Sequence, residues 1–200
     1  MRIGVFGGTF DPPHLGHLIL ATEAAYRLRL TRVLWVLTPD PPHKLTVPVS
    51  PVEYRLQMVR AIIASDALSE FSRVDLDRPG PYYAVDTLRL LQKANPDAEL
   101  VYLMGGDSLR DLPTWYHPNE LLNICAVLGV MHRVGEDIDL AALEKQLPGL
   151  AARVEFIIAP LMDISSSQIR QRIANGQPFK HFLTRSVYTI IRMNGLYAIK

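Results

Sequence analysis

Short apolar runs that alternate with helical patterns are the feature that most constrains the fold of this chain. Six such runs predict strands, at Ile3–Phe6, Val33–Leu37, Arg73–Leu76, Leu100–Met104, Ala126–Met131 and Val154–Ile158. Several are apolar at consecutive positions, which is typical of strands that are covered on both faces. Strands that alternate with helices pair in parallel, because right-handed crossovers place the helices on both faces of one sheet.

Two helix boundaries support this alternation. Ser50, Pro51 and Glu53 occupy the cap, first and third positions of a predicted helix, which is the pattern of a capping box. Gly195 follows the last apolar residues of a C-terminal helical pattern and is well placed to end that helix. We therefore expect an α/β fold, a Rossmann-like doubly wound parallel sheet of five to six strands with helices on both faces. We also expect a single domain over residues 1–200, with a C-terminal helical part from about 164 to 200 packed on the sheet.

The composition excludes several classes of function. The chain has 21 Lys and Arg against 20 Asp and Glu, and this near-neutral balance argues against binding of nucleic acid through general charge. Cys125 is the only cysteine, so neither an intrachain disulfide nor a multi-cysteine metal site can form. The apolar runs are far shorter than the roughly 20 residues that cross a membrane, and the N-terminus lacks the apolar core of a signal peptide. We expect a cytoplasmic protein without nucleic-acid or membrane partners, and the sequence leaves a homo-oligomer open.

The first candidate site follows directly after the first predicted strand. Gly7 and Gly8 let the backbone turn sharply and approach a ligand closely. A helix comes next, and its first N–H groups and its dipole favour an anion. His14 and His17 share one face of that helix, and Gly16 between them leaves space for a bulky group. The pattern predicts a phosphate-binding turn with two imidazoles; the alternatives are an ordinary turn with solvated or core histidines, or a metal site with only two evident ligands.

The second candidate site follows the last predicted strand. Ser165, Ser166 and Ser167 are good helix caps that expose hydroxyl and N–H groups. Arg170 lies within one helical turn of them, so its guanidinium reaches the same helix end and binds phosphate oxygens in bidentate fashion. This segment predicts a second anion site. The alternative is an ordinary capped helix with a solvated arginine.

Two further segments add candidates at the same edge of the sheet. Lys44 stands in the proline-rich segment 39–44, after the second predicted strand. Asp107 follows two glycines at a strand end, which suits the hydroxyl pair of a ribose. Trp115 and Tyr116 offer a flat face for an aromatic ring. The alternatives are a surface loop, a capped helix start and core aromatic side chains.

Together these motifs resemble a known family. Residues 7–17 are similar to the Gly-Gly-Thr-Phe-Asp-Pro-x-His-x-Gly-His signature of the nucleotidylyltransferase superfamily, and residues 164–170 to its Ile-Ser-Ser-x-x-Ile-Arg partner. The segments 41–44, 80–88, 105–109 and 112–116 resemble bacterial nicotinate-nucleotide adenylyltransferases, and the similarity spans nearly the whole chain. The resemblance implies transfer of AMP from ATP to nicotinate mononucleotide, which gives nicotinate adenine dinucleotide and pyrophosphate. A phosphopantetheine adenylyltransferase, a non-catalytic nucleotide sensor on the same fold and a histidine metallohydrolase are the alternatives.

The resemblance also implies residue roles. It assigns catalysis to His14, His17, Lys44 and Arg170, and nicotinate-nucleotide binding to Tyr83, Ala84, Trp115 and Tyr116. It assigns ATP binding to Gly7, Gly8, Thr9, Phe10, Asp107, Ile164, Ser165, Ser166 and Ser167. Mg²⁺ would be held mainly through the ATP phosphates, with no metal site made by the protein. The family often has Thr where this chain has Ala84, a change that is silent if the backbone N–H binds the nicotinate carboxylate.

The expected chemistry needs no nucleophilic side chain. The attacking group is already a phosphate oxyanion and pyrophosphate is a good leaving group, so positioning and charge neutralisation suffice. Neither Cys125 nor the serines are expected to form a covalent intermediate. The whole interpretation requires that the imidazole pair and Arg170 lie close together around one triphosphate.

Overall fold

The computed structural model describes residues 1–40, 49–132, 138–160 and 164–198. Its strands are β1 (Arg2–Gly8), β2 (Arg32–Leu37), β3 (Ser69–Ser72), β4 (Glu99–Gly105), β5 (Cys125–His132) and β6 (Val154–Ile158). Its helices are α1 (Leu15–Arg27), α2 (Val52–Ile63), α3 (Ala84–Ala94), α4 (Gly106–Asp111), α5 (Pro118–Ile124), α6 (Leu140–Gln146), α7 (Ser166–Ala174) and α8 (Arg185–Met193), with short 3₁₀ helices η2 (Leu112–Thr114) and η3 (Lys180–Phe182). Among these residues, no helix has the length and apolar character needed to cross a membrane.

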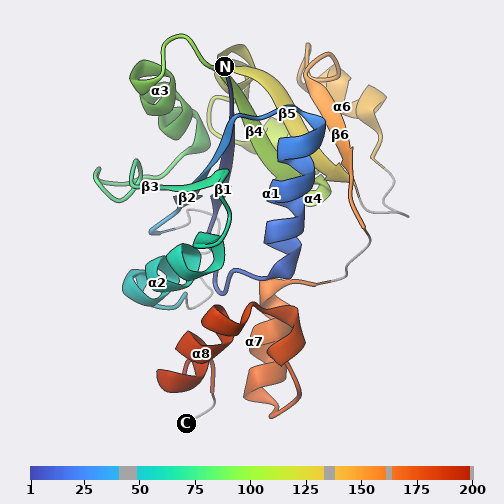
Figure 1. The fold of residues 1–200 in the computed structure, drawn as a ribbon. Coiled ribbons are helices and arrows are strands. Elements are labelled where there is room, and N and C mark those ends of the chain that lie inside the picture. The colour runs from blue at the N-terminus through green and yellow to red at the C-terminus, as the bar shows by residue number, and fades with distance from the viewer. Residues whose placement is uncertain (41–48, 133–137, 161–163, 199–200) are drawn as a thin grey trace.

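The six strands form one parallel sheet in the order β3-β2-β1-β4-β5-β6 (Figure 1). Strands β2 and β3 follow one another on one side of β1, and β4 pairs with β1 on its other side. The strand order therefore reverses between β1 and β4. In doubly wound sheets, ligands bind beyond the carboxyl ends of the strands at such a switch point. The predicted α/β fold class is confirmed.

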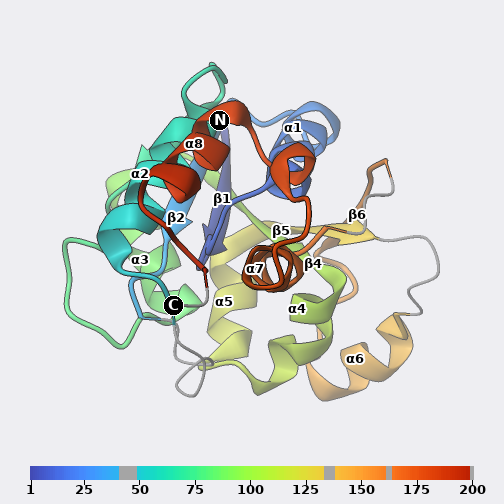
Figure 2. The ribbon, with the colours of Figure 1, turned by 90° about the horizontal axis from the view of Figure 1, so that it is seen from below.

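Two apolar cores cover the two faces of the sheet. On one face, α1 and α2 pack on strand residues such as Phe6, Trp35 and Leu103. On the other face, α3, α5 and α6 pack on residues such as Val5 and Tyr102. The view along the sheet shows these two helix layers (Figure 2). Successive side chains of a strand point to opposite faces, so a strand buried on both sides is apolar at consecutive positions.

One predicted strand is wrong. Residues 73–76 do not form a strand; the strand of this region is the preceding segment, β3, which pairs only with β2 at the sheet edge. In the structure, residues 74–77 form a turn in which Asp75 is buried. Its carboxylate accepts hydrogen bonds from Arg78 Nε (3.0 Å) and Thr87 Oγ1 (2.8 Å). The half-exposed edge strand β3 has little apolar character, so its sequence signal is weak.

The predicted capping box at Ser50 is also wrong, whereas the helix end at Gly195 is confirmed. Helix α2 begins after Pro51 as the cap residue, and no side chain caps it. The backbone of Ser50 forms two other hydrogen bonds. Its N–H donates to Asp11 Oδ2 (3.2 Å), and its carbonyl accepts a hydrogen bond from Arg55 Nε (2.8 Å). Gly195 follows α8 with a φ of +59°, the left-handed conformation that favours glycine.

The C-terminal helices lie beyond the carboxyl ends of the strands (Figures 1 and 2). Helix α8 packs against α2, where Val187 and Ile191 join the apolar core of that face. The Ser186 hydroxyl adds a hydrogen bond to the carbonyl of Ala61 (3.1 Å). Helix α7 inserts Ile169 into the same core. This packing places the second predicted phosphate segment at the end of the sheet where the first one lies.

Candidate active site

The two histidines of the first motif form one unit at the start of α1. His14 is the buried cap residue, and its backbone N–H donates to Nδ1 of His17 (3.1 Å), with the two rings 3.8 Å apart. Since Nδ1 of His17 accepts this bond, the neutral ring carries its proton on Nε2. The rings of Phe6 and Phe10 pack against His17 at 5.8 and 5.2 Å. These contacts fix an N–H donor on a ring whose orientation is set before any ligand binds.

Gly16 makes room for the neighbouring imidazole. A Cβ atom at Gly16 would lie 3.0 Å from Nδ1 of His14, which is tighter than ordinary packing. The sequence predicted that a bulky ligand group fills the space beside Gly16. In the structure the ring of His14 fills much of this space, although Gly16 still lines the cavity described below.

The two signature segments converge, as the sequence interpretation required. The Ser166 hydroxyl donates to the carbonyl of Pro12 (2.9 Å), and Nη1 of Arg170 donates to the carbonyl of Asp11 (2.7 Å). Ser165 caps α7 in a reciprocal capping box with Gln168, which orients the first N–H groups of that helix. The start of α7 is therefore bonded directly to the loop between β1 and α1.

A cavity of about 390 Å³ opens between these segments, at the switch point of the sheet. Predicted site residues from β1, α1 and α7 and from the segment after α4 line it: Gly7, His14, His17, Trp115, Ile164, Ser165, Ser166 and Ser167. Gly105 at the end of β4 and Ser108 of α4 also line it, together with side chains from β1, α1, β4 and β5. The cavity thus brings together imidazoles, hydroxyl groups and the starts of two helices, which are all groups that bind anions.

Other predicted residues lie around this cavity rather than on its wall. Arg170 holds the loop through the Asp11 carbonyl. Asp107 is exposed in the first turn of α4 and forms an ion pair with Arg110. Gly8, Thr9 and Phe10 form the turn itself, and Phe10 is buried with a φ of +49°. Lys44 lies outside the residues that the structure describes.

The predicted nicotinate side is a small recess next to Gly7. Gly7 and Tyr102 line both the main cavity and this recess of about 50 Å³, which also contacts Ala84. Ala84 is the first residue of α3. Its backbone N–H is therefore one of the first N–H groups of the helix, which have no acceptor within the helix. Tyr83, the cap residue, stacks on Tyr116 with the ring centroids 4.2 Å apart. Of the predicted nicotinate residues, Ala84 lines the recess and Trp115 lines the main cavity, whereas Tyr83 and Tyr116 line neither.

Arg55 is a site-building residue that sequence reasoning missed. It is only 2% exposed and donates hydrogen bonds to the carbonyls of Thr9 (3.1 Å), Thr38 (2.8 Å) and Ser50 (2.8 Å), and also to that of Pro39. Burial lowers its pKa, and the Asp11 carboxylate opposes this shift. Arg55 therefore joins the loop after β1 to the loop after β2. The only signal in the sequence is a charged residue on the apolar face of α2.

Asp11 is the second such residue. It is 3% exposed, and its Oδ1 accepts a hydrogen bond from the Tyr197 hydroxyl (2.7 Å), while Oδ2 accepts one from the Ser50 N–H (3.2 Å). Burial and the nearby carboxylate raise the pKa of Tyr197. The last described turn of the chain is thus bonded to the loop that carries the histidines. Asp11 stands in the 7–17 motif, but no sequence pattern linked it to Tyr197.

We expect Tyr197→Phe to lower the free energy of unfolding by about 1–3 kcal/mol, because it leaves a buried carboxylate oxygen without its donor. Chemical denaturation of the two proteins measures this difference. Tyr26→Phe is the matched control, since Tyr26 is 83% exposed and its replacement should change stability by less than about 0.5 kcal/mol. Equal losses in both variants would show that the Asp11 contact does not stabilise the fold.

These features define a class of protein. Two helix starts that converge at the switch point of a doubly wound sheet are typical of a protein that binds a nucleotide. A model of the cytidylyltransferase-like family matches residues 5–172. A Thermomicrobium roseum protein named "Probable nicotinate-nucleotide adenylyltransferase" is 43% identical, over 98% of this chain and 91% of its own length. A Thermus thermophilus protein of the same name is 42% identical, over 98% of this chain and its own full length. The chain belongs to the nicotinate-nucleotide adenylyltransferase family.

Solved structures agree on the fold. The Plasmodium falciparum nicotinic acid mononucleotide adenylyltransferase complexed with NaAD superposes with a TM-score of 0.81, at 19% identity, over 98% of this chain and 97% of that one. The same enzyme complexed with APC gives a TM-score of 0.79 at 18% identity, over 98% and 96%. These structures confirm the fold expected from the sequence, and the relatives and the family model show that the chain is a nucleotidyltransferase.

Proposed function

We propose that this chain transfers AMP from ATP to nicotinate mononucleotide and releases nicotinate adenine dinucleotide and pyrophosphate. The observation that carries the proposal is the convergence of the two signature segments on one cavity, where Ser166 and Arg170 are bonded to the loop that positions His14 and His17. Family membership supports the same reaction.

The ATP phosphates would occupy the region between the two helix starts. The first N–H groups of α1 and α7 provide partial positive charge. His14 and His17 would bind the phosphate oxygens from one side, and the serine hydroxyl groups from the other. Arg170 would add a fixed cation at the same helix. We propose Lys44, Gly8, Thr9, Phe10 and Asp107 for the remaining contacts on the strength of their matching motifs.

The nicotinate ring would lie against the aromatic side chains near α3. Trp115, Tyr116 and Tyr83 provide flat faces, and the N–H of Ala84 stands at the start of α3. A helix start favours a carboxylate over a neutral amide, because its N–H groups and dipole attract negative charge. A backbone donor is present whatever the side chain, so alanine in place of the family threonine is compatible with this contact.

The transfer is a direct displacement at the α-phosphorus. An oxygen of the nicotinate mononucleotide phosphate forms the new P–O bond, and the bond from the α-phosphorus to the pyrophosphate oxygen breaks with its electron pair going to pyrophosphate. The site residues would orient both phosphates and stabilise the negative charge that develops. Cys125 takes no part, because burial raises the pKa of its thiol to about 12.

The donor set suits Mg²⁺ that arrives on the phosphates. Within the described ranges, no group of three or more His, Cys, Asp and Glu side chains could hold a metal ion. The cavity instead presents imidazole, hydroxyl and N–H groups that bind phosphate oxygens. Mg²⁺ coordinated by phosphates and water would neutralise the charge of the leaving pyrophosphate.

We further propose that residues 1–200 act as one domain in the cytoplasm. The bonds of Tyr197 to Asp11 and of Ser186 to Ala61 make the C-terminal part an integral support of the site. A single unpaired cysteine suits a reducing compartment.

The purified chain should release pyrophosphate from ATP and Mg²⁺ when nicotinate mononucleotide is offered, with nicotinate adenine dinucleotide as the second product. Nicotinamide mononucleotide and phosphopantetheine, offered in turn, should react more slowly. Faster transfer to phosphopantetheine would contradict the assigned acceptor. ATP binding without any product would indicate a nucleotide sensor, and stoichiometric zinc by elemental analysis would indicate a metallohydrolase.

A further inference from the structure

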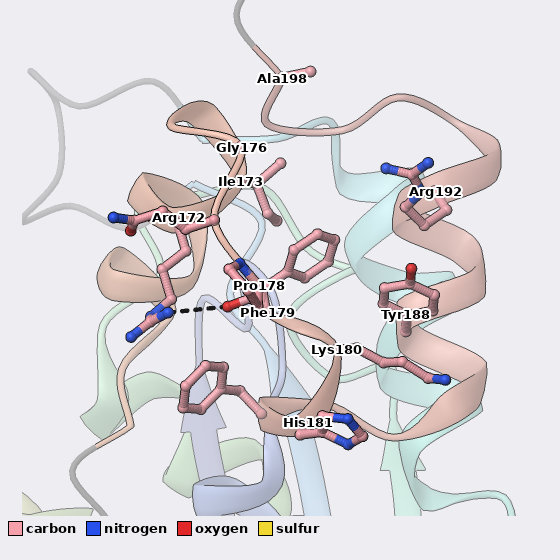
Figure 3. A pocket seen from close by; sticks show the side chains of 12 residues that line it. Arg172, Ile173, Gly176, Pro178, Phe179, Lys180, His181, Tyr188, Arg192 and Ala198 are labelled. Atoms are coloured by element: carbon pink, nitrogen blue, oxygen red, sulfur yellow. Dashed lines mark hydrogen bonds between the residues drawn. The ribbon is translucent and has the colours of Figure 1, made fainter.

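A second and larger cavity lies at the far end of α7, between α7, η3 and α8 (Figure 3). Its volume is about 650 Å³. The twelve residues that line it are Arg172, Ile173, Gly176, Gln177, Pro178, Phe179, Lys180, His181, Phe182, Tyr188, Arg192 and Ala198. None of them belongs to the ATP or nicotinate-nucleotide sites proposed above, so this cavity needs its own explanation.

The rim of the cavity is positively charged. Arg172, Lys180 and Arg192 are on it, and none of the twelve lining residues is Asp or Glu. In the part of the chain that the structure describes, these three cations form no ion pair with a carboxylate. The whole chain carries a net charge of only +1, so this is a local excess. The cavity therefore favours an anion.

The helix end beneath the cavity does not cancel this charge. The C-terminal carbonyls of a helix normally disfavour an anion. At the end of α7, however, the carbonyls of Gln171, Arg172 and Ile173 accept hydrogen bonds from the backbone N–H groups that follow, at 2.8–3.1 Å. The exposed cationic side chains consequently set the local potential.

The walls of the cavity are aromatic and held in place. The buried ring of Phe179 packs against Tyr188, with the centroids 5.2 Å apart. Arg172 is fixed twice: its Nη1 donates to the carbonyl of Pro178 (3.0 Å), and its Cζ lies 4.9 Å from the centre of the Phe182 ring (Figure 3). Nζ of Lys180 lies 6.0 Å from the centre of the Tyr188 ring. Aromatic faces and cations are thus presented side by side.

We propose that this cavity binds a nucleotide, a compound that joins an aromatic ring to a phosphate group through a sugar, at a site separate from the catalytic one. The ring packs against the half-buried Tyr188, which the buried Phe179 supports from behind, and the phosphate meets Lys180 and Arg192 at the rim. The volume lies in the range of about 300–1,000 Å³ that small-molecule sites occupy.

Equilibrium dialysis with adenosine 5′-monophosphate tests the proposal in a chain that carries His17→Glu, which places a negative charge in the catalytic site. This chain should still bind the nucleotide. Adding Lys180→Gln and Arg192→Gln should weaken that binding by about tenfold or more, since two charge-assisted contacts are lost. Adenosine alone and inorganic phosphate alone should each bind about tenfold more weakly than the nucleotide, because each lacks one half of the recognised chemistry.

The matched control replaces exposed cations elsewhere, Lys93→Gln with Lys145→Gln, which removes the same charge and should leave binding unchanged. In the background of native His17, the Lys180→Gln, Arg192→Gln pair should keep full adenylyl transfer, which separates this test from that of the catalytic function. The proposal is overturned if the His17→Glu chain binds no nucleotide, if the control pair weakens binding as much as the test pair, or if phosphate alone binds as well as the nucleotide.

Discussion

Replacing Arg55 with alanine should lower the free energy of unfolding by about 3–5 kcal/mol, the largest stability effect expected at a single side chain of the site. The guanidinium is buried and supplies hydrogen bonds to four backbone carbonyls in two loops. Its removal leaves these carbonyls without their donor and creates a cavity at the base of α2. Because the Thr9 and Thr38 carbonyls follow β1 and β2, the loops at the carboxyl ends of both strands should loosen together.

Urea denaturation measures this loss, and two further variants make it interpretable. Gln57→Ala changes an exposed residue of the same helix and should cost less than about 0.5 kcal/mol. Arg55→Lys keeps the charge but lacks the planar fork that reaches several carbonyls, so its stability should fall between wild type and alanine. A loss below about 1 kcal/mol for Arg55→Ala would mean that water replaces the guanidinium at little cost.

Replacing His17 with alanine should reduce the rate of adenylyl transfer by a factor of roughly 10²–10³, the range for loss of one transition-state donor. The backbone N–H of His14 holds Nδ1 of His17, and two phenylalanine rings hold its plane. The Nε2–H donor is therefore fixed before the substrate binds. Steady-state kinetics should show the loss mainly in kcat rather than in KM.

The variant His17→Glu should lose catalytic activity without losing stability. A glutamate at the third position of α1 accepts the N–H of the cap residue as a capping box does, so stability should stay close to that of wild type. Its negative charge faces the phosphates, so the rate should fall at least as far as in the alanine variant. A His17→Glu chain with near wild-type turnover would remove His17 from the catalytic assignment.

The structure changes the interpretation of Arg170. The sequence suggested a guanidinium that grips phosphate, whereas the structure shows Nη1 donating to the Asp11 carbonyl. Arg170 therefore also positions the loop ahead of His14. Activity lost in Arg170→Ala combines both effects, which makes His17 the cleaner probe of phosphate binding.

The local features were accessible from the sequence because they depend on neighbours in the chain. Five of the six predicted ranges lie within an observed strand or coincide with one. The central strands β1, β2 and β4 are buried on both faces, so they are apolar at successive positions. The edge strand Ser69–Ser72 was missed because it is buried on neither face. The pairing of His14 with His17 follows from their spacing on one helix.

The sequence by itself determined five of the strands, the glycine turn, the histidine pair and the capped serine helix, because each is specified by residues that are close together in the chain. Only the tertiary structure decided that Tyr197 donates to Asp11, that Arg55 joins two loops through their carbonyls, and that α7 is bonded to the loop after β1. The physical reason is that these bonds connect distant segments and often end on backbone carbonyls. A backbone carbonyl is the same group in every residue, so no side-chain pattern marks it in advance.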